Sequence, residues 1–327
     1  MAVSSAAPAD LAIQIDGLEK SYSPASTFGR RKLGPSVDVT WAVRGLSLQV
    51  RAGEIFAFLG PNGAGKTTTV EILEGFRRRD GGDVRVLGVD PARGDRAWRA
   101  RIGMVLQEGR TQPNLTVHET LELWSAYYPH PKPVAEIISL VGLDEKADER
   151  SARLSGGQRR RLDVGLALIG DPELIFLDEP TTGFDPEARR AAWVVIAGLR
   201  DLGKTVFLTT HYLDEAQELA DRVAIVKGGE IVAEGPPEQL VAGSAATEIT
   251  FVLPPGVDLR QMPGGPAMTV AGGVACVRTE LPTRVLAELC GWAAAKGIEL
   301  DRLAVTRPTL EDVYLDLIRS GEPAGAP

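Results

Sequence analysis

The most informative stretch of the chain is Gly60-Pro61-Asn62-Gly63-Ala64-Gly65-Lys66-Thr67-Thr68. It fits the pattern GxxxxGK[ST], and the elements that this pattern requires flank it on both sides. Residues 55–59 (IFAFL) are continuously apolar, as in a strand covered on both faces. The apolar residues after the stretch recur at helical spacing. Because glycines let successive backbone N–H groups surround phosphate groups, we predict a phosphate-binding loop. A glycine-rich turn with a chance lysine is the weaker alternative.

Two adjacent carboxylates follow a second apolar run. Residues 174–177 (LIFL) lead into Asp178 and Glu179, and Pro180 then stops the strand. Side chains alternate between the two faces of a strand, so the two carboxylates cannot do the same job. One could hold Mg²⁺ while the other faces an attacking water. Adjacent acids could also mark a solvated strand end, but their position beyond a phosphate loop favours the catalytic interpretation.

A glycine-rich helix start lies between these motifs: Leu154-Ser155-Gly156-Gly157-Gln158, followed by Arg159, Arg160 and Arg161. Ser155 with Gln158 fits a capping box, which alone would explain a helix start. A plain cap gains nothing from two glycines in the first turn, each of which costs about 1 kcal/mol relative to Ala. The arginines add positive charge to a helix end that is already positive, which is disfavoured by roughly 0.3–1 kcal/mol per exposed charge. We therefore predict that this helix N-terminus binds an anion.

The order of strands and helices predicts the fold class. Buried strands that alternate with helices indicate a mainly parallel α/β sheet. We expect further strands at 11–22 and 83–88 and a helical insert with helices at 117–128 and 134–141. Gln107 follows the apolar segment 102–106, where it could simply be a polar strand exit.

The pattern changes near residues 241–247. Two helices are expected beyond this point, at 283–296 and 309–318, together with short strands at 249–253, 268–270, 274–277 and 300–305. This predicts a small α+β domain. The expected organisation is a nucleotide-binding domain at 1–240 with a helical subdomain at about 95–165, a linker at 241–247, the small domain at 248–320 and a flexible tail at 321–327.

The composition excludes several classes of protein. The chain has 327 residues, 44% of them hydrophobic, which suits two globular domains. Its net charge of −8 gives no bulk attraction for nucleic acid. No apolar run is long enough for a membrane span, and the start of the sequence lacks the regions of a signal peptide, so we expect a cytoplasmic protein. Cys276 and Cys290 read as reduced packing residues, and the three histidines show no zinc-site spacing.

Five motifs in this order resemble those of the nucleotide-binding subunits of ATP-binding cassette (ABC) transporters, over roughly residues 11–240. They are the phosphate loop, Gln107 as the Q-loop residue, the signature 154–158, the Asp178-Glu179 pair and the switch residue His211. Residues 181–186 resemble the D-loop, with Phe184 where the family commonly has Leu. Tyr22 takes the place of the aromatic residue that stacks on adenine, and Trp41 is a second candidate.

The resemblance implies a fold, an activity and a set of roles. The fold is a P-loop NTPase (RecA-like) core with an antiparallel β edge and a helical insert, and the activity is ATP hydrolysis. ATP would contact Tyr22 and residues 60–68, and Mg²⁺ would bind Thr67, Gln107 and Asp178. The catalytic set would be Glu179 as general base or water-orienting residue, His211 as γ-phosphate contact, Gln107 and Lys66.

The same resemblance implies that each ATP site is shared between two subunits. A second cassette, in a homodimer or a cassette heterodimer, would cover the γ-phosphate in trans with the following residues: Ser155, Gly156, Gly157, Gln158 and Asp185. Separate membrane-spanning permease subunits would hold the cassettes at the cytoplasmic side of the cell membrane, with no role for nucleic acid.

Residues 307–314 (RPTLEDVY) are similar to the ending of ABC subunits of the daunorubicin-resistance type, which energise drug or lipid export. Acids in the first turn of a helix would explain Glu311 and Asp312 equally well. Export is thus the expected direction, with an importer subunit as the alternative. A DNA-repair or ribosome-associated ABC ATPase fits poorly, because Lys66 and Leu154 are too close for the long coiled coils of the former and the latter usually fuses two cassettes. A soluble resistance protein that only binds its ligand would not need Glu179.

Overall fold

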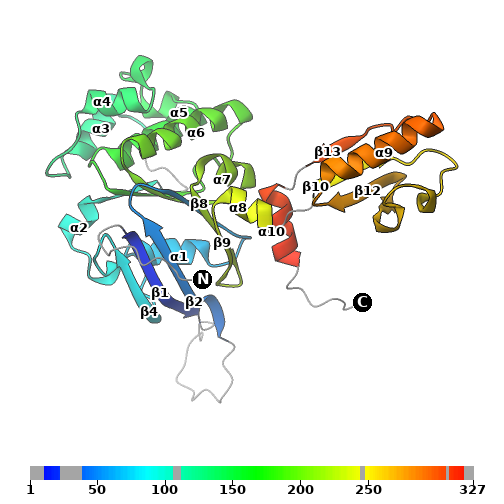
Figure 1. Cartoon of the computed structure of the whole chain (residues 1–327). Helices are drawn as coiled ribbons and strands as arrows, with labels where there is room; N and C mark the ends of the chain where they lie inside the picture. Colours follow the sequence, from blue (N-terminus) through cyan, green and yellow to red (C-terminus); the bar gives the residue numbers. More distant parts are fainter. Residues whose placement is uncertain (1–10, 23–38, 106–111, 244–246, 307–308, 320–327) are drawn as a thin grey trace, which may run out of the picture. The chain divides into compact units, whose positions relative to one another are not determined.

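The computed structural model describes residues 11–22, 39–105, 112–243, 247–306 and 309–319 (Figure 1). The chain forms two compact units, Met1–Pro237 and Glu238–Pro327. Helix α8 (Pro237–Gly243) and strand β10 (Thr247–Val252) occupy the described parts of the segment expected as a linker. Gln107 and most of the 23–40 segment lie outside the described residues.

The first unit is built on a six-stranded sheet with the order β5-β6-β7-β3-β8-β9. The strands are β3 (Ile55–Leu59), β5 (Ile102–Val105), β6 (Leu174–Asp178), β7 (Thr205–Thr210), β8 (Arg222–Lys227) and β9 (Glu230–Gly235). All neighbours are parallel except β8 and β9. Every residue of β3 is buried, which confirms the prediction of a strand covered on both faces. Because the strands are parallel, the ends of β3, β6 and β7 meet at one edge of the sheet, where the candidate site lies.

A second, antiparallel sheet covers the phosphate-loop side of this core. Its order is β2-β1-β4, from β1 (Leu11–Tyr22), β2 (Thr40–Arg51) and β4 (Gly81–Val86). The prediction of a strand over 83–88 is wrong at its end, because Leu87 has φ 49° and Gly88 has φ 79°. These left-handed conformations turn the chain so that Val86 and Val89 face each other as a bridge.

Helices cover the remaining faces of the first unit. They are α1 (Lys66–Leu73), α2 (Arg96–Ala100), α3 (Val117–Ser125), α4 (Val134–Leu140), α5 (Gly156–Leu168), α6 (Pro186–Asp201) and α7 (Leu213–Leu219). Figure 1 shows α3, α4 and α5 gathered together, as the predicted helical insert required. Their apolar residues share one core cluster with β6 and β7. A Cβ on Gly165 would lie 3.1 Å from Ile137, so α4 and α5 pack closely.

The second unit is a small α+β domain. Its sheet has the order β11-β12-β10-β13, from β11 (Thr269–Ala271), β12 (Val274–Thr279), β13 (Ala304–Thr306) and β10. Helix α9 (Pro282–Lys296) contributes Leu289 to the buried core, and α10 (Leu310–Arg319) ends the described chain. The expected strand over 300–305 is wrong at its start, because Leu300 packs into the core ahead of the strand.

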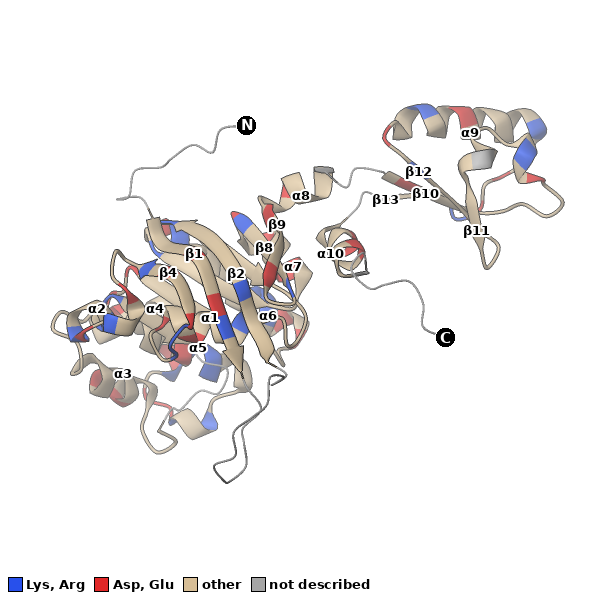
Figure 2. Cartoon of the chain, turned by 90° about the horizontal axis from the view of Figure 1, so that it is seen from below, with Lys and Arg blue, Asp and Glu red and all other residues tan. Residues whose placement is uncertain are grey.

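Membrane-spanning helices and the distribution of charge were the two surface features that the sequence raised. Within the described ranges, every helix is too short or too polar to cross a membrane. Figure 2 shows basic and acidic residues interspersed along both units. The chain as a whole has a net charge of −8.

Candidate active site

The phosphate loop joins β3 to α1 and depends on its glycines. Gly63 and Gly65 have φ values of 81° and 98°, which residues with a Cβ rarely adopt. A Cβ on Gly65 would also lie 2.1 Å from the carbonyl oxygen of Ala42, and one on Gly60 would lie 2.5 Å from that of Val226. Helix α1 begins directly after the loop, at Lys66. The loop is therefore held where the positive end of a helix meets it, an arrangement that favours bound phosphate.

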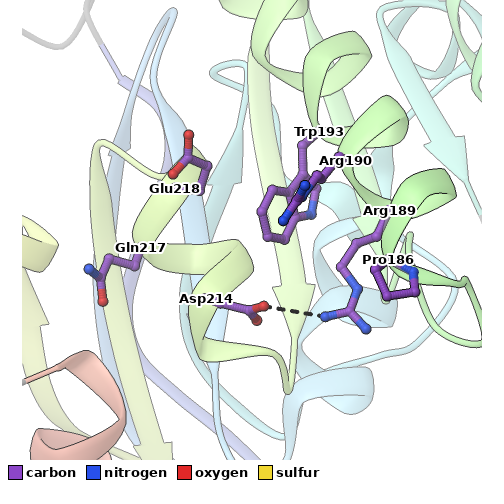
Figure 3. Close-up of a pocket in the computed structure, with 7 residues that line it drawn as sticks. All are labelled: Pro186, Arg189, Arg190, Trp193, Asp214, Gln217 and Glu218. Carbon is purple, nitrogen blue, oxygen red and sulfur yellow. Dashed lines mark hydrogen bonds and ion pairs between the residues drawn. The ribbon is translucent and has the colours of Figure 1, made fainter.

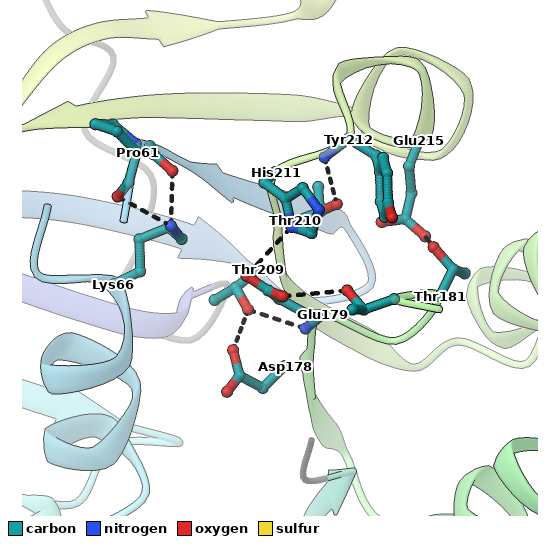
Figure 4. A network of polar contacts seen from close by, with 12 residues as sticks. Pro61, Lys66, Asp178, Glu179, Thr181, Thr209, Thr210, His211, Tyr212 and Glu215 are labelled. Atoms are coloured by element: carbon teal, nitrogen blue, oxygen red, sulfur yellow. Dashed lines mark hydrogen bonds and ion pairs between the residues drawn. The ribbon is translucent and has the colours of Figure 1, made fainter. Parts of the chain in front are cut away.

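The ammonium group of Lys66 is held inside this loop (Figure 4). Nζ donates to the carbonyl oxygens of Gly60, at 2.6 Å, and Pro61, at 3.2 Å, and the residue is 7% exposed. Burial lowers the pKa of Lys66, while the nearby charges of Glu179 and Asp178 oppose the shift. Phosphate oxygens are stronger acceptors than carbonyls, so a triphosphate in the loop would draw this ammonium to itself.

Thr209 organises the two carboxylates at the end of β6. It lies opposite Asp178 in the parallel register of β6 and β7 and is fully buried. Its hydroxyl donates to Oδ1 of Asp178 and accepts from the backbone N–H of Glu179 at 3.2 Å (Figure 4). The sequence motifs did not predict this role of Thr209. The available signal was a hydroxyl directly after the apolar run 206–208, two residues before His211.

Glu179 and His211 come together although they follow different strands. Nδ1 of His211 lies 3.3 Å from Oε1 of Glu179, and Oε2 of Glu179 accepts from the hydroxyl of Thr182 at 3.1 Å. The Glu179 side chain is 14% exposed and that of His211 is 41% exposed. The carboxylate is thus oriented from both sides at the edge of the site, as a residue that positions water requires.

Tyr22 is the better placed of the two candidate aromatic residues. Its hydroxyl lies 3.3 Å from Oγ1 of Thr68, in the first turn of the helix that follows the phosphate loop. The guanidinium of Arg77 lies 5.4 Å from the ring centroid. Trp41 lies on the neighbouring strand, where it pairs with Ser21. The contact with Thr68 favours Tyr22 as the aromatic residue next to a bound nucleotide.

The protein groups available to a metal ion are oxygen donors. No group of three His, Cys, Asp or Glu side chains placed to hold a metal occurs among the described residues. Thr67 is exposed in the first turn of α1, and Asp178 presents its carboxylate at the end of β6. Hydroxyl and carboxylate oxygens suit Mg²⁺, which usually takes one or two protein ligands and completes its shell with phosphate and water. The residues present therefore fit Mg²⁺.

The start of α5 is a capping box, but the capping box does not account for Gly156. The hydroxyl of Ser155 accepts from the N–H of Gln158 at 3.2 Å, and Oε1 of Gln158 accepts from the N–H of Ser155 at 2.9 Å. A Cβ on Gly156 would meet no atom within 4 Å, so packing within the chain does not require glycine there. A surface hollow of about 250 Å³ lies between this helix start and the segment that contains Asp185.

The three arginines after the signature all donate hydrogen bonds to backbone carbonyl oxygens of the chain. Arg160 donates to the carbonyl oxygens of Pro180 and Asp178, and Arg161 donates to that of Gly142 at 2.8 Å. Arg159 donates to the carbonyl oxygen of Leu154 at 3.2 Å. The interpretation as surplus charge at the helix N-terminus is wrong for Arg160, because its side chain is buried and bonds to the 178–180 segment. Arg161 lines the hollow beside the helix start.

A second hollow, of about 360 Å³, lies between α6 and α7 (Figure 3). Arg189 contributes to its wall, pairs with Asp214 at 3.3 Å and lies 4.4 Å from the ring centroid of Tyr212. Tyr212 in turn packs against the ring of His211, with a centroid distance of 4.1 Å. Side chains of α6 and α7 therefore support the segment that carries His211.

The phosphate loop, the paired carboxylates and the facing histidine define an ATPase of the phosphate-loop class. Comparison with known families agrees: the model described as ABC transporter matches residues 43–182. The model described as ABC transporter domain-containing protein-like, C-terminal domain, matches residues 247–309. The chain is 36% identical over 322 residues to the Daunorubicin resistance ATP-binding protein DrrA3 of Streptomyces coeruleorubidus, covering 94% of this chain and 96% of that protein. The chain belongs to the ABC transporter family of ATP-binding proteins.

Further relatives support the same family. The Nod factor export ATP-binding protein I of Paraburkholderia xenovorans (strain LB400) is 37% identical over 251 residues, or 75% of this chain and 78% of that protein. Among solved structures, cbiO1 from Clostridium perfringens, part of the ABC transporter complex cbiONQ, superposes with a TM-score of 0.63 at 25% identity, covering 72% of this chain and 92% of that one. The dimeric ATP-binding cassette MJ0796, bound to ADP and Pi in a post-hydrolysis state, gives a TM-score of 0.57 at 25% identity, covering 68% and 98%. The predicted P-loop fold, family membership and ATPase activity are confirmed.

Proposed function

We propose that this ATPase works as a dimer of cassettes that powers export, with two ATP molecules bound between two head-to-tail subunits. The observation that carries the proposal is Gly156. A Cβ at this position would face open space within the chain, and glycine costs up to about 1 kcal/mol relative to Ala in a helix. A group that approaches from outside the chain accounts for that cost.

The group that approaches Gly156 is the γ-phosphate of an ATP bound to the other subunit. The hydroxyl of Ser155 accepts a bond from Gln158, and its hydrogen is then available to donate to a phosphate oxygen. Gly157 and Asp185 line the hollow beside this helix start. The positive end of α5 and these groups together cover the side of the γ-phosphate that one phosphate loop leaves exposed.

Within each site, the chain's own residues position the reacting groups. Lys66 turns from the loop carbonyls to the β- and γ-phosphates, and Tyr22 packs against the adenine. Glu179 accepts a hydrogen bond from the attacking water, and His211 holds that carboxylate and contacts the γ-phosphate. Thr67, Asp178 and Gln107 would hold Mg²⁺, which when bound neutralises charge on the β- and γ-phosphates.

Export is favoured by two observations. Residues 307–314 resemble the ending of the daunorubicin-resistance type, and the two relatives described above are named for daunorubicin resistance and for Nod factor export. We therefore propose a drug-like or lipid-like substrate and separate membrane-spanning subunits that hold the cassettes at the cytoplasmic side of the membrane. Residues 1–240 would form the cassette, and 248–320 an accessory domain joined to it by 241–247.

The Glu179→Gln variant tests whether the ATP site is shared between two subunits. We expect unchanged ATP binding, no turnover and an ATP-dependent dimer that accumulates in light scattering, because the base is lost while the phosphate contacts remain. Glu122→Gln, an exposed acid on α3, serves as the control and should hydrolyse ATP normally. A Glu179→Gln protein that stays monomeric at saturating ATP would contradict the shared site.

The direction of transport needs a separate experiment. The chain should co-purify with the membrane protein encoded beside it, and the pair should accumulate a fluorescent drug inside inverted membrane vesicles when ATP is added. ATP-driven loss of a preloaded drug from the same vesicles would indicate import instead.

A further inference from the structure

The guanidinium group of Arg160 spans the backbone at Glu179. Its Nε donates to the carbonyl oxygen of Pro180 and its Nη2 to that of Asp178, both at 3.0 Å. These carbonyls belong to the residues directly before and after Glu179. We propose that Arg160 is a positioning residue for ATP hydrolysis, which holds the backbone of Glu179 so that its carboxylate faces the attacking water. The inference rests on the proposed function, since it takes Glu179 as the residue that acts on water.

Glu179 adopts a conformation that needs such support. Its φ of 46° lies in the left-handed region, which costs roughly 1–2 kcal/mol for a residue with a Cβ. Strained conformations of this kind persist only where several contacts fix them. Strand β7 fixes the N–H of Glu179, which donates to the carbonyl oxygen of Thr209 at 3.0 Å and to its hydroxyl at 3.2 Å. Arg160 fixes the chain on both sides of the residue, from helix α5.

The chemistry of the contact favours arginine over lysine. Arg160 is 8% exposed, and burying a cation is unfavourable unless it is well hydrogen-bonded. A guanidinium offers several N–H donors in a rigid plane and can hold two carbonyls at once, whereas a lysine ammonium is a compact charge on a flexible stem. The neighbouring Arg159 and Arg161 bond to carbonyls elsewhere, so only Arg160 of this run touches the segment around Glu179 among the described contacts.

Arg222 offers a matched control for the loss of a buried arginine. It is also largely buried, with a side chain that is 16% exposed. It donates to the carbonyl oxygen of Gln49 at 3.0 Å and to Glu54 at 2.9 Å. It begins β8 and pairs with Phe56 near the start of β3, whereas the phosphate loop follows the other end of β3. Arg222→Gln should therefore reduce the stability of the fold without changing kcat.

Steady-state ATPase measurements on Arg160→Gln, Arg160→Lys and Arg222→Gln test the proposal. For Arg160→Gln we expect kcat to fall at least about tenfold while KM and the Kd for ATP stay within about twofold, because only the step that uses Glu179 is affected. Arg160→Lys, which can reach one carbonyl, should be intermediate. A normal kcat in Arg160→Gln, or an equal loss of ATP affinity, would overturn the positioning role. If Arg160→Gln does not fold, the split between kcat and KM is read from Arg160→Lys.

A second measurement separates this inference from the proposed dimer. Arg160→Gln is combined with Glu179→Gln, and dimer formation at saturating ATP is followed by light scattering. We expect the double variant to form the dimer as the Glu179→Gln protein does, and a double variant that stays monomeric would show that Arg160 supports the signature helix instead. A Glu179→Gln single variant without a dimer refutes the shared site. If Glu179→Gln forms the trapped dimer and Arg160→Gln hydrolyses ATP at the normal rate, only the role of Arg160 is refuted.

Discussion

Nδ1 of His211 lies 3.3 Å from Oε1 of Glu179, although the two residues follow different strands of the main sheet. The parallel pairing of β6 and β7 makes this contact possible, because both strands end at the same edge. The other carboxylate oxygen accepts from Thr182. The Glu179 carboxylate is therefore oriented by groups on both sides before any substrate arrives.

Removal of the histidine ring tests this orientation. We expect His211→Ala to lower kcat by about a hundredfold, within the usual range for loss of an acid-base or water-positioning group. The Kd for ATP should change little, because the phosphate loop remains intact. His118→Ala, on the exposed face of α3, is the control and should behave as the wild type. Equal rates for the two variants would rule out the proposed role of His211.

Thr209 provides a test of the connection between the two carboxylates. Thr209→Val keeps the shape of the side chain but removes the bonds to Asp178 and to the N–H of Glu179. We expect the free energy of unfolding to fall by about 1–3 kcal/mol and the Mg²⁺ concentration needed for half-maximal activity to rise. Thr209→Ser keeps the hydroxyl and should restore both. Urea unfolding and Mg²⁺ titration measure the two effects, and a valine variant with unchanged Mg²⁺ dependence would count against the link.

Gly156→Ala separates folding from function. The new methyl group meets open space within the chain, so the helix should become more stable by up to about 1 kcal/mol. Turnover should nevertheless fall, because the methyl group stands where the partner's ATP approaches. Gly198→Ala in the middle of α6 also meets open space and should give the stability gain alone. An active, stabilised Gly156→Ala protein would be incompatible with the proposed shared site.

A bulky substitution at the start of α5 gives a complementary test of the shared site. Ser155→Arg should abolish hydrolysis while the monomer still binds nucleotide with unchanged affinity, measured by fluorescence titration. Weaker binding to the monomer would mean that the signature serves the site of its own chain.

Glu74 predicts a pH dependence of stability. It follows α1, is 7% exposed, and burial together with the charges of Asp178 and Glu71 raises its pKa from 4.5 to about 8. Because the folded-state pKa is the higher one, this group's contribution to stability is complete below pH 4.5 and is lost as the pH rises through about 8. Glu74→Gln should therefore gain stability relative to the wild type between pH 5 and pH 8, by about 1.4 kcal/mol per pH unit at most. Urea unfolding without nucleotide and Mg²⁺ measures the difference, which should be absent in Glu122→Gln.

The sequence predicted those parts of the fold whose residues are constrained by burial and by backbone geometry. The apolar run 55–59 and the glycine loop after it identified β3 and α1, because a short apolar run that ends at such a loop is typical of a strand covered on both faces. Element ends were less accurate. The turn at Leu87 uses a left-handed non-glycine residue, and a leucine side chain does not predict that conformation.

The site was predictable where motifs fix chemistry and unpredictable where long side chains choose partners. Glu179 lies beside His211, and the charges of Asp178 and Glu179 act on Lys66, as the resemblance to ABC subunits implied. The partners of Thr209 depend on the register of β6 and β7, and those of Arg160 depend on how α5 is placed beside the segment that follows β6. Neither the strand register nor the placement of α5 can be predicted from the residues near Arg160 or Thr209 in the sequence. Gln107 stays a prediction, since it lies outside the described residues.

Helix α5 carries two sets of groups within its first turns. Its start holds Ser155 and Gly156, and the next turn holds Arg160, which contacts the backbone at Glu179. A helix is stiff over so short a distance, so any tilt that moves one set also moves the other. In the proposed dimer these sets face different ATP molecules. Closure of one site would then set the geometry of hydrolysis in the other, so that the two ATP molecules would be hydrolysed in a coordinated order and not independently.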